Sequence, residues 1–451
     1  MDNNPIKKRM ARRQHIYRKR IPYGMMNFVS VRERDCYYVD KTPFIEEIEN
    51  SNMYFFYIRP RRFGKSLTLS MLKQYYDINM ADRFEELFGG LYIGENPTPE
   101  HNTYLIISLN FAVVDANLEN YKKGLDAHCN TEFNYFCDVY AQYLPANLKE
   151  EMNKKDGAAE QLDYLCKECK KTGQKVYLFI DEYDHFTNTI LAEPDCLNSY
   201  QAETHGTGYL RKFFDTIKSA TDSTLERVFV TGVSPVTMDD LTSGFNIGTN
   251  YSLAYEFNEM TGFTEEEVRE MLTYYTDTLN LHNYTVDELI ELMKPWYDNY
   301  CFAKASYGET TMYNSNMVLY FIDNYIRNRG RLPENMIEEN IRNDYNKFRL
   351  LINKSLGFAH NTSIIRQLVE KGFVAGELKA VFSAEQIGDP DNFVSLLYYF
   401  GLITIAGSYQ GKTKFVIPNK TVREQVFCSL LNTNKEKDQK YENINLVCEE
   451  V

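Results

Sequence analysis

The segment Arg59–Ser66 reads Arg-Pro-Arg-Arg-Phe-Gly-Lys-Ser and lies between two runs with different periodicity. Residues 53–58 form an apolar run typical of a strand, and residues 67–76 have the pattern of a helix. A strand that enters a helix through Gly-Lys-Ser is typical of a phosphate-binding loop, or Walker A motif, with the pattern Gly-x-x-x-x-Gly-Lys-Ser/Thr. Arg59 stands where that pattern has its first glycine. The segment therefore predicts an α/β fold and a candidate nucleotide site, and a basic turn before a helix is the alternative interpretation.

Each residue of such a loop has an expected part in binding phosphate. Backbone amides and the helix N-terminus point at phosphate oxygens, and Gly64 lets the backbone come close to them. Lys65 is expected to reach the β- and γ-phosphates, and the Ser66 hydroxyl to hold Mg²⁺. The predicted nucleotide-binding residues are Arg59, Pro60, Arg61, Arg62, Phe63, Gly64, Lys65, Ser66 and Leu67.

A second run, Lys175–Glu182, supplies the acidic half of the candidate site. Five consecutive apolar residues indicate a strand buried on both faces of a parallel sheet, and the strand ends in Asp181 and Glu182. Ligands bind open α/β sheets at the carboxyl ends of the strands. Asp181 is predicted to hold Mg²⁺, and Glu182 to orient or deprotonate the attacking water. An acidic turn after a core strand is the alternative, and the upstream Gly-Lys-Ser weighs against it.

A third strand, Arg227–Gly232, fits the same sheet. A polar residue at the end of a strand beside the acidic one is placed to sense the γ-phosphate of a nucleotide. Thr231 and Ser234 are the candidate sensors. A simple strand end, with a turn at Gly232 and Pro235, is an equally good interpretation.

The composition and charge of the chain are those of a globular protein. The 451 residues are 43% hydrophobic, as in a globular protein, and carry a net charge of −13, which disfavours nonspecific nucleic-acid binding by the whole surface. Residues 1–20 carry +7 and the remainder −20, so the N-terminus is a basic tail. This tail could contact a nucleic-acid or protein partner, and a solubilising extension is the default interpretation. No apolar segment has the length of a signal peptide or a membrane span. Nine cysteines without a framework of spacings suggest a reducing, cytoplasmic environment.

The order of the patterns predicts five segments. Strands alternating with helices indicate a mainly parallel sheet, and helices without a clear strand follow. The predicted bounds are 1–20 for the basic tail, 21–245 for a P-loop ATPase-like domain, 246–365 for a helical lid, 366–428 for a winged-helix-like region and 429–451 for a polar tail.

Two helix starts are predicted from capping signals. Thr264 with Glu267 three residues later forms a capping box. Thr42 before Pro43 predicts a second start, with Thr42 as the cap and Pro43 as the first helical residue.

The winged-helix-like region is inferred from a helix at Phe393–Tyr399 followed by a hairpin, in which 402–405 and 414–417 pair across a glycine-rich turn. Its candidate wing has a modest basic cluster made by Lys412, Lys414, Lys420 and Arg423. Such folds bind nucleic acid or pack on protein, and both remain open, with protein packing favoured.

Several of these runs resemble a known family, the predicted AAA-ATPase-like proteins common in gut anaerobes such as Bacteroidetes. The resemblance extends over residues 21–425 and is carried in order by Tyr38–Thr42, Arg59–Ser66, Phe179–Asp184, Thr231–Pro235, Met260–Thr264, Trp296–Tyr300, Tyr313–Ser315 and Ile417–Lys420. In that family, arginine in place of the first loop glycine is usual, so Arg59 is expected to have a negative φ. Relatives often have glycine where this chain has Asn299.

The resemblance implies an ATPase core, a helical lid and a winged-helix-like region. Many relatives carry a C-terminal nuclease domain, but no Asp…Glu-x-Lys constellation is visible here, and nuclease activity is not predicted. The leading hypothesis is Mg²⁺-dependent ATP hydrolysis that drives a conformational change in the lid and winged-helix-like region. Lys65 and Glu182 are the candidate catalytic residues, and Arg61 and Arg62 could neutralise γ-phosphate charge in cis or across a homo-oligomer interface. The alternative is a slow nucleotide-dependent switch that binds a protein or nucleic-acid partner. ATP as the nucleotide follows from the resemblance alone.

Overall fold

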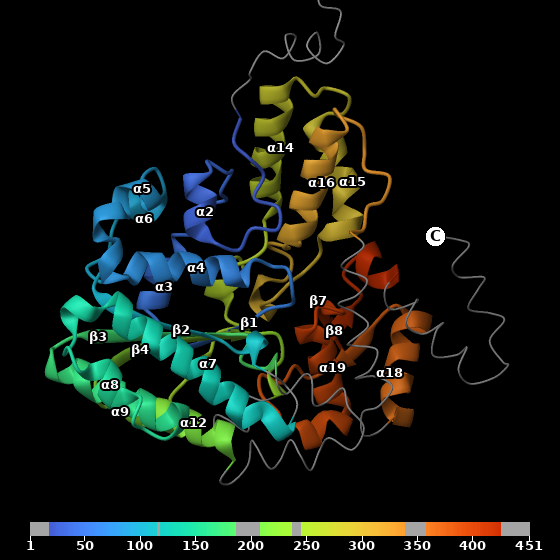
Figure 1. Cartoon of the computed structure of the whole chain (residues 1–451). Coiled ribbons are helices and arrows are strands. Elements are labelled where there is room, and N and C mark those ends of the chain that lie inside the picture. Colours follow the sequence, from blue (N-terminus) through green and yellow to red (C-terminus); the bar gives the residue numbers. More distant parts are fainter. Residues whose placement is uncertain (1–17, 115–117, 186–207, 237–244, 339–357, 425–451) are drawn as a thin grey trace, which may run out of the picture.

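The computed structural model describes residues 18–114, 118–185, 208–236, 245–338 and 358–424 (Figure 1). Most of the predicted basic tail and all of the predicted polar tail lie outside these residues. Within them, no helix is both long and apolar enough to cross a bilayer.

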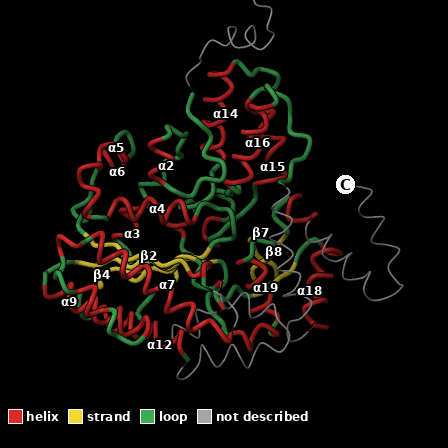
Figure 2. The backbone as a smooth tube through the Cα atoms, viewed as in Figure 1, coloured by secondary structure: helices red, strands yellow, loops and turns green. Residues whose placement is uncertain are grey.

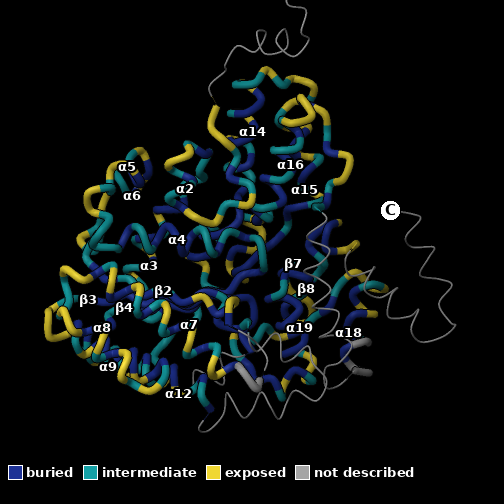
Figure 3. The backbone as a smooth tube through the Cα atoms, viewed as in Figure 1, coloured by how far each residue is buried: buried dark blue, intermediate teal, exposed yellow. Residues whose placement is uncertain are grey.

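A five-stranded parallel sheet forms the centre of the first half of the chain (Figure 1). In spatial order its strands are β2 (Tyr104–Asn110), β3 (Lys175–Asp181), β4 (Leu225–Gly232), β1 (Tyr54–Ile58) and β5 (Thr249–Asn250). The strands β1, β3 and β4 are almost entirely buried, as Figure 3 shows, which explains their continuous apolar runs. The predicted parallel α/β core is confirmed.

The register of the sheet brings three strand ends to one edge. Ile58 of β1 lies opposite Gly232 of β4, and Ile180 of β3 lies opposite Val230. The strand β4 therefore separates the loop strand from the acidic strand. The carboxyl ends of all three face the same side, where open α/β sheets bind ligands.

Helices cover both faces of this sheet, and Figure 2 shows the strands as one layer between them. The first face carries α2 (Phe28–Glu33), α3 (Phe44–Glu49), α4 (Lys65–Tyr76), α5 (Phe84–Phe88) and α6 (Tyr92–Glu95). The second face carries α7 (Leu118–Val139), α8 (Leu148–Met152), α9 (Gly157–Lys171) and α12 (Tyr209–Thr221).

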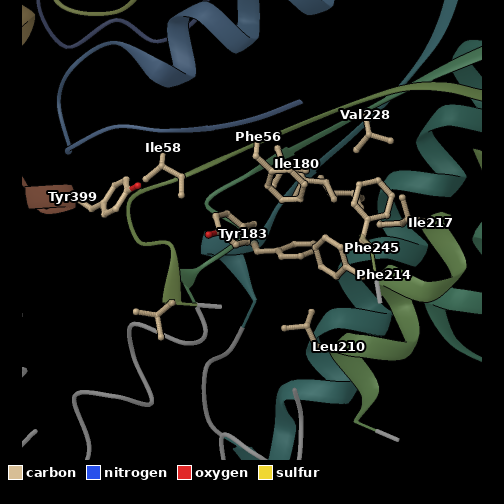
Figure 4. Packing of buried hydrophobic residues seen from close by; sticks show 14 of the residues in the cluster. Phe56, Ile58, Ile180, Tyr183, Leu210, Phe214, Ile217, Val228, Phe245 and Tyr399 are labelled. Carbon is tan, nitrogen blue, oxygen red and sulfur yellow. The ribbon is translucent and has the colours of Figure 1, made fainter. Parts of the chain in front are cut away.

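Side chains alternate between the two faces along each strand. Phe55 and Tyr57 of β1 belong to the core under α4, whereas Phe56 and Ile58 belong to the core on the other side. Figure 4 shows this second core, where Phe56 lies near Phe245. This alternation shows that both faces of β1 are packed against the core, up to the residue that precedes the loop.

One predicted helix start is wrong by one residue. The helix α3 begins at Phe44 with Pro43 as its cap, and no side chain caps it. The Thr42 hydroxyl is engaged elsewhere, since it donates to Asp40 Oδ1 at 2.7 Å and accepts from the Ile93 amide at 3.2 Å.

The lid consists of three helices with their own hydrophobic core. They are α14 (Glu265–Leu279), α15 (Val286–Tyr297) and α16 (Ser315–Arg327). The predicted capping box is confirmed, because Thr264 and Glu267 exchange hydrogen bonds at the start of α14. In Figure 1 these helices stand above the carboxyl edge of the sheet.

A smaller helix-and-sheet unit follows the lid. It contains α18 (Phe358–Lys371), β6 (Val374–Gly376), α19 (Pro390–Tyr399), β7 (Thr404–Tyr409) and β8 (Lys412–Val416). Its three strands form an antiparallel sheet in the order β6-β8-β7. The predicted hairpin is confirmed, and the order of helices and strands is that of a winged-helix-like fold.

The predicted domain bounds differ from the observed elements in two places. Residues 249–250 add a strand to the central sheet, although the predicted ATPase-like domain ends at residue 245. The helix α18 begins at Phe358, within the predicted lid, but packs on α19 and β6. The bounds themselves remain predictions.

Candidate functional site

The loop between β1 and α4 turns at two residues, and neither is Arg59. Arg62 has a φ of 68° and Gly64 a φ of 93°, both in the left-handed region. Arg59 is not among the residues with a positive φ, so the predicted backbone is confirmed. Because an ordinary residue adopts a negative φ without strain, position 59 does not require glycine.

The Arg59 side chain lies in the protein core, with 1% of its surface exposed. Its guanidinium donates to the carbonyl oxygens of Ser252 at 2.5 Å and Phe257 at 2.8 Å. The group also lies 4.3 Å from the ring centroids of both Tyr57 and Phe302. This side chain therefore joins the end of β1 to the segment after β5.

The Lys65 side chain lies along the loop that it follows. Its ammonium donates to the carbonyl oxygens of Arg59 at 2.9 Å and Pro60 at 3.0 Å. Burial lowers the pKa of Lys65, while the nearby Glu182 and Asp181 carboxylates act in the opposite direction. The amine is therefore held inside the loop, beside the acidic end of β3.

Ser66 and Asp181 meet across the carboxyl edge of the sheet. The Ser66 hydroxyl donates to Asp181 Oδ2 at 2.9 Å. Burial raises the pKa of Asp181, and the neighbouring Glu182 raises it further. A hydroxyl oxygen beside a carboxylate is an oxygen-rich pair of the kind that a hard divalent cation prefers.

Glu182 follows β3 in a turned backbone. Its φ is 53°, and its amide donates to Asp181 Oδ1 at 3.0 Å. This turn separates the directions of the two acidic side chains. Glu182 lines the cavity described next, whereas Asp181 contacts Ser66 at its edge.

A cavity of about 310 Å³ opens beside the loop. The loop and the start of α4 line one part of it, and the N-terminal segment and the lid line the rest. The lining residues are Pro22, Gly24, Met25, Met26, Tyr37, Tyr38, Val39, Lys41, Arg61, Arg62, Phe63, Gly64, Lys65, Ser66, Leu67, Thr68, Glu182, Met260, Thr261, Gly262, Phe263, Ser315, Asn316 and Leu319. Of the predicted nucleotide-binding residues, Arg59 and Pro60 are not in this lining.

The model of the family described as Predicted AAA-ATPase matches residues 22–242. Over these residues the chain is similar to the predicted AAA-ATPase family. The match contains the loop, the acidic strand and β4, and it ends before the lid.

One relative is the uncharacterized protein in the vnfD 5′ region of Azotobacter chroococcum mcd 1, which is 29% identical over 255 residues. The alignment covers 56% of this chain and 44% of the relative, so the chain spans less than half of that protein's length.

Two solved structures align over most of the chain with low scores. Cdc6p from Pyrobaculum aerophilum has a TM-score of 0.31 at 12% identity, covering 93% of this chain and 96% of that chain. The Aeropyrum pernix ORC2 protein, in ADPNP-ADP complexes, has a TM-score of 0.36 at 10% identity, covering 88% and 92%. At such scores the fold assignment rests on the strand order observed here.

The two candidate sensors, Thr231 and Ser234, are buried and do not line the cavity. The Thr231 hydroxyl donates to the Tyr57 carbonyl at 2.8 Å, which fastens β4 to β1. The Ser234 amide donates at 2.6 Å to Asp184, a fully buried carboxylate that also accepts from Val233. Asp184 thus fixes the turn after β4, and the sensor roles remain predictions.

The lid contacts the loop directly beside the cavity. The Arg62 carbonyl accepts from the Ser315 hydroxyl at 3.2 Å and from the Asn316 amide at 3.3 Å. The Arg62 guanidinium lies 2.8 Å from Glu338 Oε2. Gly262 donates its amide to the Phe63 carbonyl at 2.9 Å. Arg62, a candidate γ-phosphate ligand, is therefore engaged with the lid in this structure.

Lys41 is a cavity residue to which sequence reasoning assigned no role. Its ammonium donates to both Glu267 oxygens, at 2.6 and 2.8 Å, and to the Glu259 carbonyl at 2.9 Å. Burial lowers the pKa of Lys41, and its ion pair with Glu267 opposes this. Glu267 also closes the capping box of α14, so Lys41 ties the N-terminal segment to the start of the lid. The Tyr-Val-Asp-Lys-Thr run of the family resemblance was the available signal.

Proposed function

We propose that the chain binds ATP with Mg²⁺ in this cavity and hydrolyses the bond to the γ-phosphate. One observation carries the proposal: the Ser66 hydroxyl and the Asp181 carboxylate lie 2.9 Å apart, with Lys65 on one side and Glu182 on the cavity wall. These are the four groups that phosphoryl transfer by a P-loop enzyme needs, and the parallel sheet brings them together.

The oxygen pair fits Mg²⁺ better than a metal that needs a complete protein cage. Among the described residues, no group of three or more His, Cys, Asp or Glu side chains is arranged to hold a metal. Mg²⁺ commonly takes one or two protein oxygens and completes its shell with water and substrate phosphates. Ser66 and Asp181 would hold it, and the ion would neutralise charge on the β- and γ-phosphates.

Lys65 supplies positive charge at the phosphate end of the cavity. Its present acceptors are the carbonyl oxygens of Arg59 and Pro60, both within the loop. A phosphate oxygen is a stronger acceptor than a carbonyl because it is charged. On nucleotide binding, the amine would exchange these loop contacts for the β- and γ-phosphates.

Glu182 is the residue proposed to act on water. Its carboxylate belongs to the cavity lining, while its backbone is fixed by the bond from its amide to Asp181. A carboxylate in this position orients a water molecule or accepts its proton as the new bond to phosphorus forms. Positioning and charge neutralisation supply the rate gain.

The far end of the cavity suits a nucleobase. Met25, Tyr37, Val39, Met260 and Leu319 give this end an apolar lining from both the N-terminal segment and the lid. A flat base would be buried between these two parts of the chain, so the lid position would depend on occupancy. This supports the proposed coupling of hydrolysis to a movement of the lid. Adenine is proposed because of the family match.

The test is steady-state phosphate release from ATP and Mg²⁺ by the wild type and Glu182→Gln. We expect the variant to bind ATP as tightly as the wild type and to turn over about 10²- to 10⁴-fold more slowly, as for loss of a general base. Glu266→Gln, at an exposed position on α14, is the matched control and should leave the rate unchanged.

Lys65→Ala provides the binding control. It should abolish the thermal shift that ATP and Mg²⁺ give to the wild type, because the phosphates lose their main positive partner. Retained binding with an unchanged rate in Glu182→Gln would contradict hydrolysis by this residue. No shift in the wild type would contradict nucleotide binding altogether.

A further inference from the structure

The helix α19 of the winged-helix-like region is an interior helix. Eight of its ten residues, Asn392 through Tyr399, are buried. A helix that reads a nucleic-acid groove must expose one face to the groove. The faces of α19 are instead occupied by contacts within the protein, and Figure 4 shows Tyr399 near Ile58, at the end of β1.

The turn that ends α19 lies against the phosphate-binding loop. Gly401 has a φ of 75°, and a Cβ added there would lie 2.8 Å from Pro60 Cβ and 2.9 Å from Pro60 Cγ. Real Cβ atoms rarely approach so closely, so backbone and proline ring are in direct contact. Pro60 is the second residue of the loop, 341 positions earlier in the chain.

Aromatic side chains make a second connection between the same two parts. The Phe63 ring packs edge-on against the rings of Tyr300 and Phe302, with centroid distances of 4.8 Å and 5.2 Å. The Phe302 carbonyl accepts from the hydroxyl of Tyr398, in α19, at 2.7 Å. A shift of Phe63 would therefore reach α19 through a single intermediate residue, Phe302.

Hydrogen bonds hold the intervening segment to the hairpin side of the region. The Cys301 amide donates to the Thr404 hydroxyl at 2.8 Å, and Asn419 Nδ2 donates to the Asp298 carbonyl at 2.9 Å. All these groups are buried. Segment 298–302 is thus fixed to the winged-helix-like region and contacts the loop through its aromatic rings.

We propose that the winged-helix-like region regulates the nucleotide site, with α19 as the element that transmits the effect to Pro60 and Phe63. The proposal rests on the proposed function. Phosphates must be cradled by the backbone of the same loop whose Pro60 and Phe63 contact this region. A partner that displaces α19 would change nucleotide affinity, and by linkage a bound nucleotide would change the affinity for that partner equally.

The test compares two glycine-to-alanine variants that share the same backbone strain. Gly401→Ala and Gly372→Ala both place alanine at a φ of 75°. The new Cβ clashes with the Pro60 ring at position 401, whereas nothing lies within 4 Å of the Cβ position at Gly372. Hydrogen exchange of the peptide covering residues 59–68 is measured first without nucleotide, and then ATP affinity is measured in the presence of Mg²⁺.

Relative to Gly372→Ala, we expect Gly401→Ala to raise the hydrogen-exchange rate of residues 59–68 and to lower the ATP affinity, each by about fivefold or more. Fivefold is about the lower end of usual allosteric couplings. Equal exchange in the two variants would overturn the proposal. If the wild type binds no ATP, the proposed function fails, while the nucleotide-free exchange still decides the coupling.

A variant on the loop side covers the case in which Gly401→Ala does not fold. Pro60→Ala removes the ring that contacts Gly401. The amides of Gly401 and Leu402, which donate to Tyr398 and Leu397 in the wild type, should then exchange faster than in Gly372→Ala. Unchanged protection of these two amides would overturn the coupling from the other end.

Discussion

The Ser66 hydroxyl donates to Asp181 Oδ2 at 2.9 Å, although 115 positions separate the two residues. Ser66 is the second residue of α4, and Asp181 is the last residue of β3. The strand β4 lies between β3 and the strand that leads to α4. The sheet therefore holds this pair at a fixed separation without a ligand, which is the preorganisation that the proposed phosphoryl transfer would require.

Ser66→Ala should reduce ATP turnover at limiting Mg²⁺ by about 100-fold, the usual cost of losing one group that stabilises transition-state charge. The variant lacks one of the two oxygens proposed to hold the ion. Ser66→Thr keeps the hydroxyl and should retain most of the rate. The measurement is phosphate release as a function of Mg²⁺ concentration. If alanine and threonine variants respond to Mg²⁺ alike, the hydroxyl has no part in holding the ion.

Asp181→Asn should make the protein more resistant to heat at neutral pH while stopping turnover. Burial and the neighbouring Glu182 raise the pKa of Asp181 in the folded state, so its ionised form costs stability. For an acid with a raised pKa, that cost is complete above the folded pKa and disappears below the unfolded one, which is about 3.9 for aspartate.

The increase in melting temperature for Asp181→Asn should therefore be largest at pH 7 to 8 and shrink as the pH falls toward 4. Thermal unfolding without nucleotide across this range measures it. The exposed Asp82 serves as the control, since Asp82→Asn should change little at any pH. A melting temperature at or below that of the wild type at pH 7 would show that the hydrogen bond from Ser66 outweighs burial.

Asn299 occupies a backbone position that favours glycine. Its φ is 76°, in the left-handed region, where asparagine is tolerated better than other residues with a side chain. Asn299→Ala should lower the free energy of unfolding by about 1 kcal/mol, whereas Asn299→Gly should leave it unchanged or raise it slightly. Urea unfolding measures both. Asn50→Ala, at a φ of −75°, should show no such penalty for alanine.

Much of the core could be predicted from the sequence because its signals are local. The strands β1, β3 and β4 are buried on both faces, so their apolar runs are continuous and easily recognised. The Gly-Lys-Ser turn and the acidic strand end are also local patterns. Because parallel strands share one ligand-binding edge, their meeting in space could be inferred as well.

Other features depend on contacts between distant residues and leave little local trace. The strand β5 has only two residues and no apolar run, so nothing in its sequence marks it. The contact between Gly401 and Pro60, and the engagement of Arg62 by the lid, arise only in the folded chain. Threonine is a common helix N-cap residue, yet the Thr42 hydroxyl forms its hydrogen bonds with Asp40 and Ile93 instead.

Arg59→Gly restores the usual first glycine of a phosphate-binding loop and should nevertheless damage the protein. The guanidinium is buried, bridges the carbonyls of Ser252 and Phe257, and lies over the rings of Tyr57 and Phe302. Removing it takes the guanidinium donor from the Ser252 carbonyl, leaves the Phe257 carbonyl with only the longer bonds from Tyr57 at 3.3 Å and Met260 at 3.4 Å, and opens a cavity between the rings. We expect a loss of about 3–5 kcal/mol in the free energy of unfolding.

Arg59→Lys separates the charge of this side chain from its shape. A lysine ammonium keeps the positive charge but cannot reach two carbonyls with a planar fork while stacking between two rings, so it should recover less than half of the loss. Urea unfolding of the wild type and both variants gives the comparison. A glycine variant as stable as the wild type, with tighter ATP binding, would show that Arg59 is a defect of the loop. The expected order of stability, arginine above lysine above glycine, follows because position 59 belongs to the core while its neighbours form the loop.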